Sequence, residues 1–205
     1  GNAGDAIADV KSIPIYSKPI TITADGYAKA VLLSSEGTVI DEIAKDFSIN
    51  LATGKKIKLT TTPAINFPGE GNAFGLINGV RSDRGANSTE WLGWQGADME
   101  AVIDLGTPKS ITSVSVHVLT ARGSQPCKPQ WLEVFTSIDG KNFIAAGKAT
   151  NIKQDKLNMG TLDLLIRKTT AQFIRVKVKG FGKIPDGMPG AGNDSWLFLD
   201  EIQIR

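Results

Sequence analysis

The stretch SWLFLDEIQIR, residues 195–205, consists almost entirely of residues that favour β-strands. A run rich in glycine and proline, GMPGAGND at residues 187–194, precedes it and predicts a loop. The expected strand carries two adjacent carboxylates, Asp200 and Glu201. Because successive side chains of a strand point to opposite faces, this pattern predicts that the two acids do not line one site.

Segments of the same kind recur along the chain and predict an all-β fold. They are short, rich in β-branched residues and bounded by turn formers, whereas helical periodicity is scarce. Such spacing is typical of β-sandwiches, and Asp139-Gly140 predicts a hairpin between two of the strands. The expected strands are PITITA (19–24), YAKAVLLS (27–34), KKIKLTT (55–61), MEAVIDLG (99–106), SITSVSVHVL (110–119), QWLEVFTSI (130–138) and FIRVKVKGF (173–181).

Composition excludes several classes of function. With 23 basic and 21 acidic residues among 205, the net charge is +2, which argues against nucleic acid or an anionic membrane as partner. No apolar run reaches the roughly 20 residues that span a bilayer. The single Cys127 excludes an internal disulfide and a cysteine-based zinc cluster. The single His117 alternates within SVSVHVL and is interpreted as a strand residue of the scaffold.

A change in composition predicts a domain boundary near residue 62. The segment TTTPAINFPGEGNAFG, residues 60–75, concentrates turn formers and lacks periodicity. We therefore expect a small β domain over residues 1–62 and a larger β domain over residues 63–205. The first is short for an independent sandwich, which usually takes about 100 residues.

The order of motifs from residue 66 to residue 205 resembles the discoidin, or coagulation factor 5/8 type C, domain. The motifs are GLINGVRSDRGANSTEWLGWQGADMEAVIDLG, ITSVSVHVL, KPQWLEVFTSIDGKNF, AQFIRVKVKGFG and SWLFLDEIQI. This resemblance implies an eight-stranded, jelly-roll-like β-sandwich with a structural calcium. It also implies a carbohydrate-binding module like those at the C-terminus of bacterial β-N-acetylhexosaminidases and α-fucosidases.

The N-terminal piece, through YSKPITITADGYAKAVLLSSEGTV, resembles part of the small Ig-like linker domain found beside the catalytic barrel of such enzymes. The resemblance implies an upstream catalytic domain in a longer protein, and an extracellular, periplasmic or cell-surface location. It also implies a monomer that binds a glycan.

A calcium site is implied by carrying the family motifs over to this chain. Calcium takes six to eight oxygen ligands, which loops rich in Asn, Asp, Gly and Thr supply. The family's Asp-Gly turn, its Thr before a Trp and its acid in the last strand correspond to Asn78, Thr89 and Glu201. Asn78 replaces the usual aspartate and the loop is longer, so Asp83 is included as a compensating charge. The alternative is an ordinary turn with solvated acids.

A sugar site is expected among the loops. Sugars bind aromatic faces together with a few polar groups that hydrogen-bond their hydroxyls. Trp94 in the turn WLGWQG and Trp196 after the glycine-rich loop are the candidate platforms, and packing is the alternative for each. Arg122 in TARGSQ and Asn193 in AGNDS are candidate hydrogen-bonding residues, with solvated loop residues as the alternative. Galactose- or N-acetylhexosamine-type glycans are the expected ligands.

The alternatives to a sugar-binding module are an enzyme, a membrane or protein-adhesion module, and a structural spacer. Glycoside hydrolysis needs two carboxyl groups facing each other across a sugar, which neither Asp200 with Glu201 nor Asp98 with Glu100 is predicted to provide. The long loops are mainly Gly, Ser, Asn and Asp, with Met188 an exception, which argues against membrane insertion. We therefore predict a non-catalytic module.

Overall fold

The computed structural model describes residues 14–205, which form two compact units divided between Ile49 and Asn50. The prediction placed this boundary near residue 62. The division falls earlier because β3 (Lys56–Leu59) pairs with β5 (Met99–Leu119) of the second unit. Ala52 is likewise buried in the second unit's core. Residues 1–13 of the predicted N-terminal domain lie outside the described residues.

The first unit contains one antiparallel hairpin, β1 (Gly26–Leu33) and β2 (Val39–Phe47). Its turn is closed by the Gly37 amide, which donates to the Ser34 carbonyl at 3.0 Å. Residues 19–24, predicted as a strand, have no regular structure. The described part of this unit thus shows two strands, and the Ig-like assignment stays an expectation.

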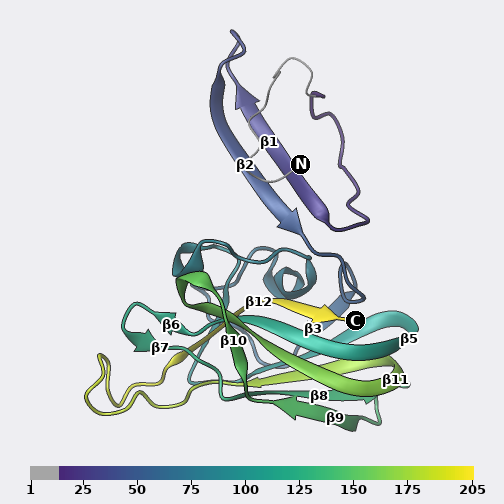
Figure 1. The fold of residues 1–205 in the computed structure, drawn as a ribbon, viewed down its shortest axis with the longest axis vertical. Helices are drawn as coiled ribbons and strands as arrows, with labels where there is room; N and C mark the ends of the chain where they lie inside the picture. Colours follow the sequence, from purple (N-terminus) through teal and green to yellow (C-terminus); the bar gives the residue numbers. More distant parts are fainter. Residues whose placement is uncertain (1–13) are drawn as a thin grey trace. The chain divides into compact units, whose positions relative to one another are not determined.

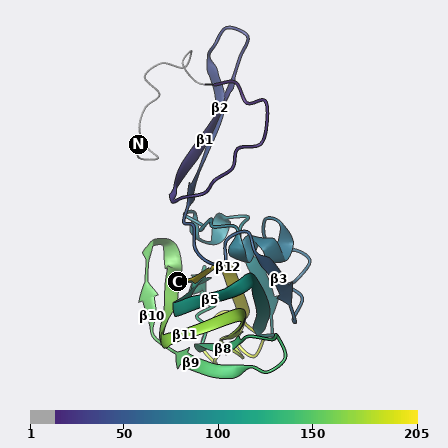
Figure 2. The same cartoon turned by 90° about the vertical axis from the view of Figure 1, so that its right-hand side faces the viewer.

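The second unit is a β-sandwich in which two long strands, β5 and β11 (Met159–Lys179), pair with each other along most of their length. Figures 1 and 2 show these strands bending together across the unit. The other elements are η2 (Asn72–Ile77), η3 (Gly85–Asn87), β4 (Leu92–Gln95), β6 (Ala121–Arg122), β7 (Gln125–Pro126), β8 (Trp131–Ser137), β9 (Ile144–Ala149), β10 (Ile152–Gln154), η4 (Lys156–Asn158) and β12 (Trp196–Ile204).

Both β5 and β11 pass from one layer to the other. The first half of β5 and the second half of β11 lie in one layer, and their remaining halves lie in the other. Residues 99–104 of β5 and 173–178 of β11 pair with each other, β3 pairs with residues 101–104 of β5, β8 pairs with residues 173–179 of β11, and β9 extends this layer. The opposite halves of the two strands pair with β12 and β10, and β4 extends that layer. The expectation of an eight-stranded, jelly-roll-like all-β sandwich is confirmed, although the segments predicted at 99–106 and 110–119 form one continuous strand.

The core lies between these layers and consists of alternate residues of the long strands. Val114, Val116 and Val118 of β5 are fully buried, as are Ile202 and Ile204 of β12. Each large aliphatic side chain removed from water in this way contributes about 1.5 to 3 kcal/mol to stability.

The hairpin predicted at Asp139-Gly140 connects β8 and β9. Among the described residues, no helix has the length and apolarity needed to cross a membrane.

Candidate functional site

A β-bulge in β12 determines where the two adjacent acids lie. Leu199 pairs with Val118 and Glu201 pairs with His117, so Asp200 is an extra residue in the strand. Leu199 and Ile202 both face the core. The bulge therefore places Asp200 and Glu201 together beneath one loop, and the prediction that alternation separates them is wrong.

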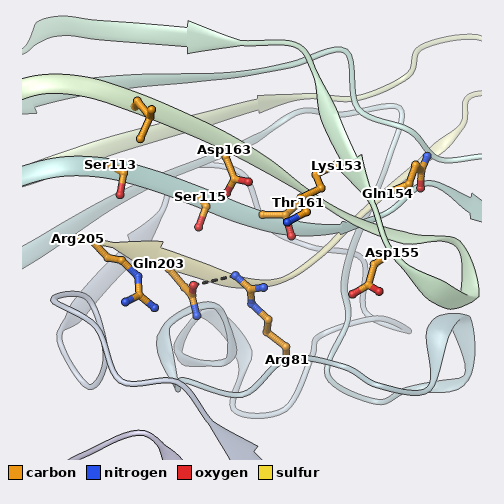
Figure 3. Close-up of a pocket in the computed structure, with 11 residues that line it drawn as sticks. Arg81, Ser113, Ser115, Lys153, Gln154, Asp155, Thr161, Asp163, Gln203 and Arg205 are labelled. Carbon is orange, nitrogen blue, oxygen red and sulfur yellow. Dashed lines mark hydrogen bonds between the residues drawn. The ribbon is translucent and has the colours of Figure 1, made fainter.

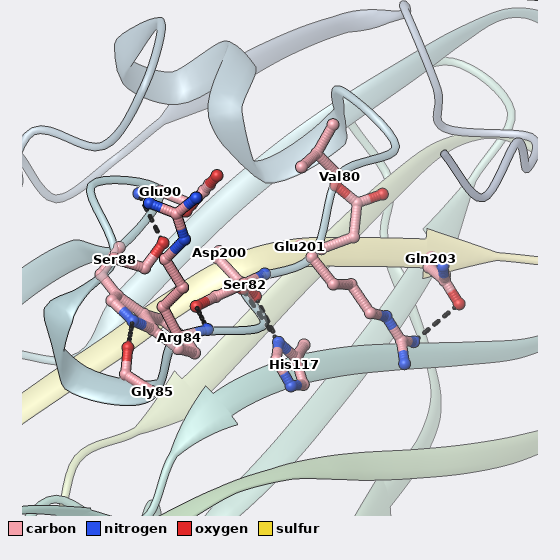
Figure 4. Close-up of polar contacts among 12 residues, drawn as sticks. Val80, Ser82, Arg84, Gly85, Ser88, Glu90, His117, Asp200, Glu201 and Gln203 are labelled. Carbon is pink, nitrogen blue, oxygen red and sulfur yellow. Dashed lines mark hydrogen bonds and ion pairs between the residues drawn. The ribbon is translucent and has the colours of Figure 1, made fainter. Parts of the chain in front are cut away.

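Asp200 is fully buried and fixed by the scaffold. Its Oδ1 lies 2.7 Å from Nδ1 of His117, and its Oδ2 accepts a hydrogen bond from the Ser82 amide at 2.6 Å. The His117 ring stacks on Trp91, with centroids 5.5 Å apart. Figure 4 shows Asp200 close to Ser82 and His117. His117 is thus a buried scaffold residue, and its contacts hold the loop before β4 against β12.

Glu201 is also fully buried, but its contacts are longer. Its carboxylate accepts hydrogen bonds from the Gly79 amide at 3.2 Å and from the Asn50 side-chain amide at 3.4 Å. Burial raises the pKa of Glu201 to about 9; the Gly79 hydrogen bond opposes this shift, and the charge of Asp200 adds to it. A buried carboxyl that forms no ion pair among the described residues is suited to a cation, whose charge would offset the burial.

Two of the four predicted calcium ligands, Asn78 and Glu201, are linked through the backbone of Gly79. Asn78 precedes Gly79, whose amide donates to the Glu201 carboxylate, while the Oδ1 of the half-buried Asn78 side chain accepts the Val80 amide hydrogen. Asp83 is 76% exposed and lies 3.8 Å from Arg84. Within residues 14–205, no hydrogen bond or ion pair joins Asp83 to Asn78 or Glu201, and no group of three or more acidic, His or Cys residues forms a metal-binding cluster.

Thr89 is likewise separate from Glu201. Its exposed hydroxyl donates to the Glu70 carboxylate, a partner that the sequence analysis did not identify. Glu201 and Asn78 are therefore the candidate oxygen donors linked through Gly79, and the placement of Asp83 and Thr89 does not add to them.

Trp94 is a core residue, and the prediction that it offers a surface platform is wrong. Its side chain is 1% exposed, and its indole nitrogen donates to the Thr61 carbonyl at 3.1 Å. Trp94 lies on β4 opposite Leu197 of β12, and both side chains belong to the main core. A ring enclosed in this way has no free face for a ligand.

The other predicted platform, Trp196, belongs to a partly exposed aromatic cluster. Its ring stacks on Phe198, with centroids 5.4 Å apart and planes inclined by 11°. Phe67 packs edge-on against both rings, at 5.0 Å from Trp196 and 5.1 Å from Phe198. The exposed guanidinium of Arg122 lies 4.8 Å from the centroid of Phe67. Two of the predicted sugar-site residues, Trp196 and Arg122, are therefore joined through Phe67.

Sequence reasoning missed Phe67, because this residue lies in a turn-rich segment without periodicity. Hydrogen bonds between Gly93 and the segment of residues 64–67 hold that segment beside β4. A Cβ atom on Gly93 would lie 2.8 Å from Phe67 and 2.7 Å from Phe198. Gly93 in WLGWQG was the sequence feature that could have indicated this contact, since a glycine permits the close approach of neighbouring side chains.

Asn193 lies in the loop that leads into Trp196, and its side chain is exposed. The Ile184 amide donates to the Asn193 carbonyl at 2.9 Å, and Lys183 forms an ion pair with Asp194 at 2.9 Å. Buried Ile184 anchors the loop from within. These contacts fix the backbone on which Asn193 lies, but no hydrogen bond joins its side chain to Arg122 among the described residues.

Residues 58–193 match the F5/8 type C domain, and the chain belongs to this family. The family consists of non-catalytic binding modules, which agrees with the prediction that the chain is not an enzyme. Both acids of the pair in β12 are fully buried, so they present no catalytic carboxylates at the surface. No curated protein matches the chain.

Several solved structures share the fold. The lectin domain of lectinolysin, complexed with Lewis B antigen, is 14% identical, with a TM-score of 0.52 over 78% of this chain and 97% of its own. The Clostridium perfringens module CpGH89CBM32-5, in complex with GalNAc-β-1,3-galactose, is 17% identical, with a TM-score of 0.50 over 76% and 99%. A fucose-binding module of Streptococcus pneumoniae is 16% identical, with a TM-score of 0.50 over 76% and 94%.

Proposed function

We propose that the second unit is a carbohydrate-binding module that recognises a terminal galactose- or N-acetylhexosamine-type sugar at the aromatic cluster. The cluster consists of Trp196, Phe67, Phe198 and Arg122. The observation that carries this proposal is the stacking of partly exposed Trp196 on Phe198 beside an exposed guanidinium. This arrangement combines an oriented aromatic surface with charged hydrogen-bond donors, which is the chemistry that sugar recognition requires.

Each residue of the cluster has a distinct role in this proposal. The Trp196 ring covers the apolar C–H surface of the pyranose, while Phe198 and Phe67 hold that ring in one orientation. The Arg122 guanidinium, positioned over Phe67, donates hydrogen bonds to ring hydroxyls. Asn193 supplies an amide from the adjoining loop. Preorganisation matters because a side chain that is already ordered loses less entropy on binding.

The ligands of the similar structures support the class of ligand. GalNAc-β-1,3-galactose, fucose and Lewis B antigen are bound by modules of the same fold. The near-neutral composition of this chain also favours an uncharged partner. A structural spacer and an adhesion module are the alternatives, and the exposed guanidinium of Arg122 beside the rings favours a sugar site over a spacer.

We further propose a structural calcium held by Glu201 and Asn78. Bound calcium would supply positive charge to the buried Glu201 carboxyl and fix the loop that Gly79 joins to β12. Thr89 and Asp83 enter this proposal only if the loop rearranges, because their present partners are Glu70 and Arg84. The ion has no catalytic role here.

In its biological setting the chain is proposed to be a monomeric accessory module of a secreted bacterial glycoside hydrolase. The first unit then serves as an Ig-like linker to an upstream catalytic domain, at an extracellular, periplasmic or cell-surface location. This setting rests on the resemblance of the sequence to modules of exo-glycosidases.

A glycan array tests the proposed ligand class. The purified chain is applied with Trp196→Ala and Trp131→Ala variants alongside. Trp131 is a matched control, because it is also partly buried at a strand start but contacts Lys148 rather than the cluster. Binding to galactose- or N-acetylhexosamine-terminated glycans that is lost in Trp196→Ala and kept in Trp131→Ala supports the proposal. Equal binding by both variants would exclude the cluster as the site.

A further inference from the structure

A polar cleft of about 650 Å³ lies on the outer face of the layer formed by β12, β5, β11 and β10. Its floor carries small hydroxyl side chains from neighbouring strands, Ser113 and Ser115 of β5 and Thr161 of β11. Figure 3 shows these residues between longer polar side chains. Because short side chains occupy the middle of the sheet, the face is hollow, and its volume falls within the range of about 300 to 1,000 Å³ that ligand sites occupy.

Cross-strand pairing fixes the order of groups across this floor. Gln203 of β12 lies opposite Ser115, which lies opposite Asp163 of β11. In the adjoining row, Thr161 lies opposite Lys153 of β10. Residues paired in this way share one face of the sheet, so an amide, a hydroxyl and a carboxylate lie side by side across the cleft.

One rim of the cleft is preorganised by a buried amide. Gln203 is only 6% exposed, and its Oε1 accepts a hydrogen bond from Arg81 Nη2 at 2.8 Å. The buried Nε of Arg81 has no hydrogen-bond partner among the described residues. A buried polar group without a partner is costly, so this atom indicates a ligand or solvent in the cleft.

The charges around the cleft favour an uncharged ligand. Arg81, Arg205 and Lys153 are basic, whereas Asp155 and Asp163 are acidic. Asp163 projects from the middle of the floor, where it would repel an anion but can accept from a hydroxyl. Every sugar hydroxyl both donates and accepts a hydrogen bond. Leu165, which is 84% exposed, adds one apolar surface at the edge for a pyranose C–H face.

We propose that this cleft is a second ligand site, which binds a neutral oligosaccharide lying across the strands. The site is distinct from the aromatic cluster, since none of its lining residues belongs to that cluster. It lacks a stacking ring and relies on hydrogen bonds along an extended polyhydroxylated chain. The proposal therefore stands or fails independently of sugar binding at Trp196.

The test is an NMR titration of the full chain with three neutral probes, cellohexaose, mannohexaose and xylohexaose, and with hexagalacturonate as an acidic probe. For at least one neutral probe at millimolar concentration, we expect shifts of the Ser113, Ser115 and Thr161 amides. The variant Ser115→Gln fills the floor and should weaken that binding at least tenfold. Ser110→Gln is the matched control, because it adds the same side chain to an exposed position of the same strand outside the cleft.

The outcomes separate the two sites. Trp196→Ala should leave the shifts in the cleft unchanged, even if it abolishes binding at the cluster. Binding of hexagalacturonate alone, equal weakening by Ser110→Gln and Ser115→Gln, or no response to any neutral probe would each overturn the proposal. A heat-melting comparison confirms that Ser115→Gln is folded, and Asp163→Asn serves as a second variant if it is not.

Discussion

The guanidinium of Arg122 lies 4.8 Å from the ring centroid of Phe67, which in turn packs edge-on against Trp196 at 5.0 Å. Arg122 of the short strand β6 and Trp196 of β12 are thereby held in one cluster by a residue more than 50 positions from either in the sequence. The Arg122→Gln variant keeps a polar side chain but removes the charge. Because hydrogen bonds to charged groups contribute about 1.5 to 3 kcal/mol, affinity for the sugar should fall by about tenfold or more.

Calorimetric titration of the preferred sugar measures this effect of Arg122→Gln. The melting temperature should change little, since the guanidinium is exposed. Unchanged affinity would remove Arg122 from the sugar site, whereas a large drop in melting temperature would assign it a structural role.

Chelation should destabilise the protein if calcium binds beside Glu201. At 100 times the dissociation constant, a ligand stabilises the folded state by about 2.7 kcal/mol. For a chain of this size, that corresponds to a change in melting temperature of about 5 to 10 °C. Calorimetric melting with chelator, and then with excess calcium, should show the drop and its reversal.

The Glu201→Gln variant provides the control for this calcium effect. It keeps the shape of the buried side chain but removes the ligand charge, so its melting temperature should not respond to chelator. With chelator present, it should melt no lower than the unchanged protein, because burial already disfavours the ionised carboxyl. A calcium response retained by Glu201→Gln would place the ion elsewhere.

The buried pair of His117 and Asp200 should be important for stability. Their side chains are 3% and 0% exposed, and Asp200 also accepts the Ser82 amide hydrogen. Removing one partner of a buried pair typically costs about 3 to 5 kcal/mol, so Asp200→Leu should lower the free energy of unfolding by about that amount. Denaturant unfolding measures this loss. Asp163→Leu is the control, since Asp163 is exposed and its replacement should lower the free energy of unfolding far less. Equal costs for the two variants would contradict the structural role of the pair.

The β8–β9 turn should make stability depend on pH in the acid range. Hydrogen bonds from the Asn142 and Lys141 amides and the Asn142 and Ser137 side chains hold the pKa of Asp139 well below its usual value of 3.8. Because the folded-state pKa is depressed, the stabilisation is present above the unfolded value and is lost as pH falls through the folded value. The melting-temperature difference between the unchanged protein and Asp139→Ala should therefore shrink below about pH 4.

The Ser137→Ala variant checks the cause of this pH effect. It removes one donor to Asp139, so its pH dependence should lie between those of the unchanged protein and Asp139→Ala. If the melting-temperature difference between Asp139→Ala and the unchanged protein stays constant down to pH 2, the turn is not the origin of the pH dependence.

Strand alternation and ordered motifs were sufficient to predict the sandwich, the β8–β9 hairpin and the last strand. They were insufficient at β12, where the bulge at Asp200 places two adjacent acids under one loop. A bulge arises from pairing with another strand, and the local residue pattern does not specify it. The same limit explains the error at Trp94, because the pairing of β4 with β12 determines which tryptophan is enclosed.

The aromatic cluster was predicted only in part, for a similar reason. Trp196 was identified from its position after a predicted loop and Arg122 from its position in one, but Phe67 joins them through tertiary contacts that no local pattern reveals. Among the candidate metal ligands, Glu201 accepts a hydrogen bond from Gly79, the residue after Asn78, whereas Asp83 and Thr89 have other partners.

The central claim is that Trp196 provides the surface on which a sugar binds. Calorimetric titration of N-acetylgalactosamine and galactose into the unchanged protein, Trp196→Ala and Trp131→Ala tests it most directly. Loss of a stacked aromatic ring should weaken binding of the preferred sugar at least tenfold in Trp196→Ala, with little change in Trp131→Ala. Unaltered binding by a folded Trp196→Ala variant would contradict the claim.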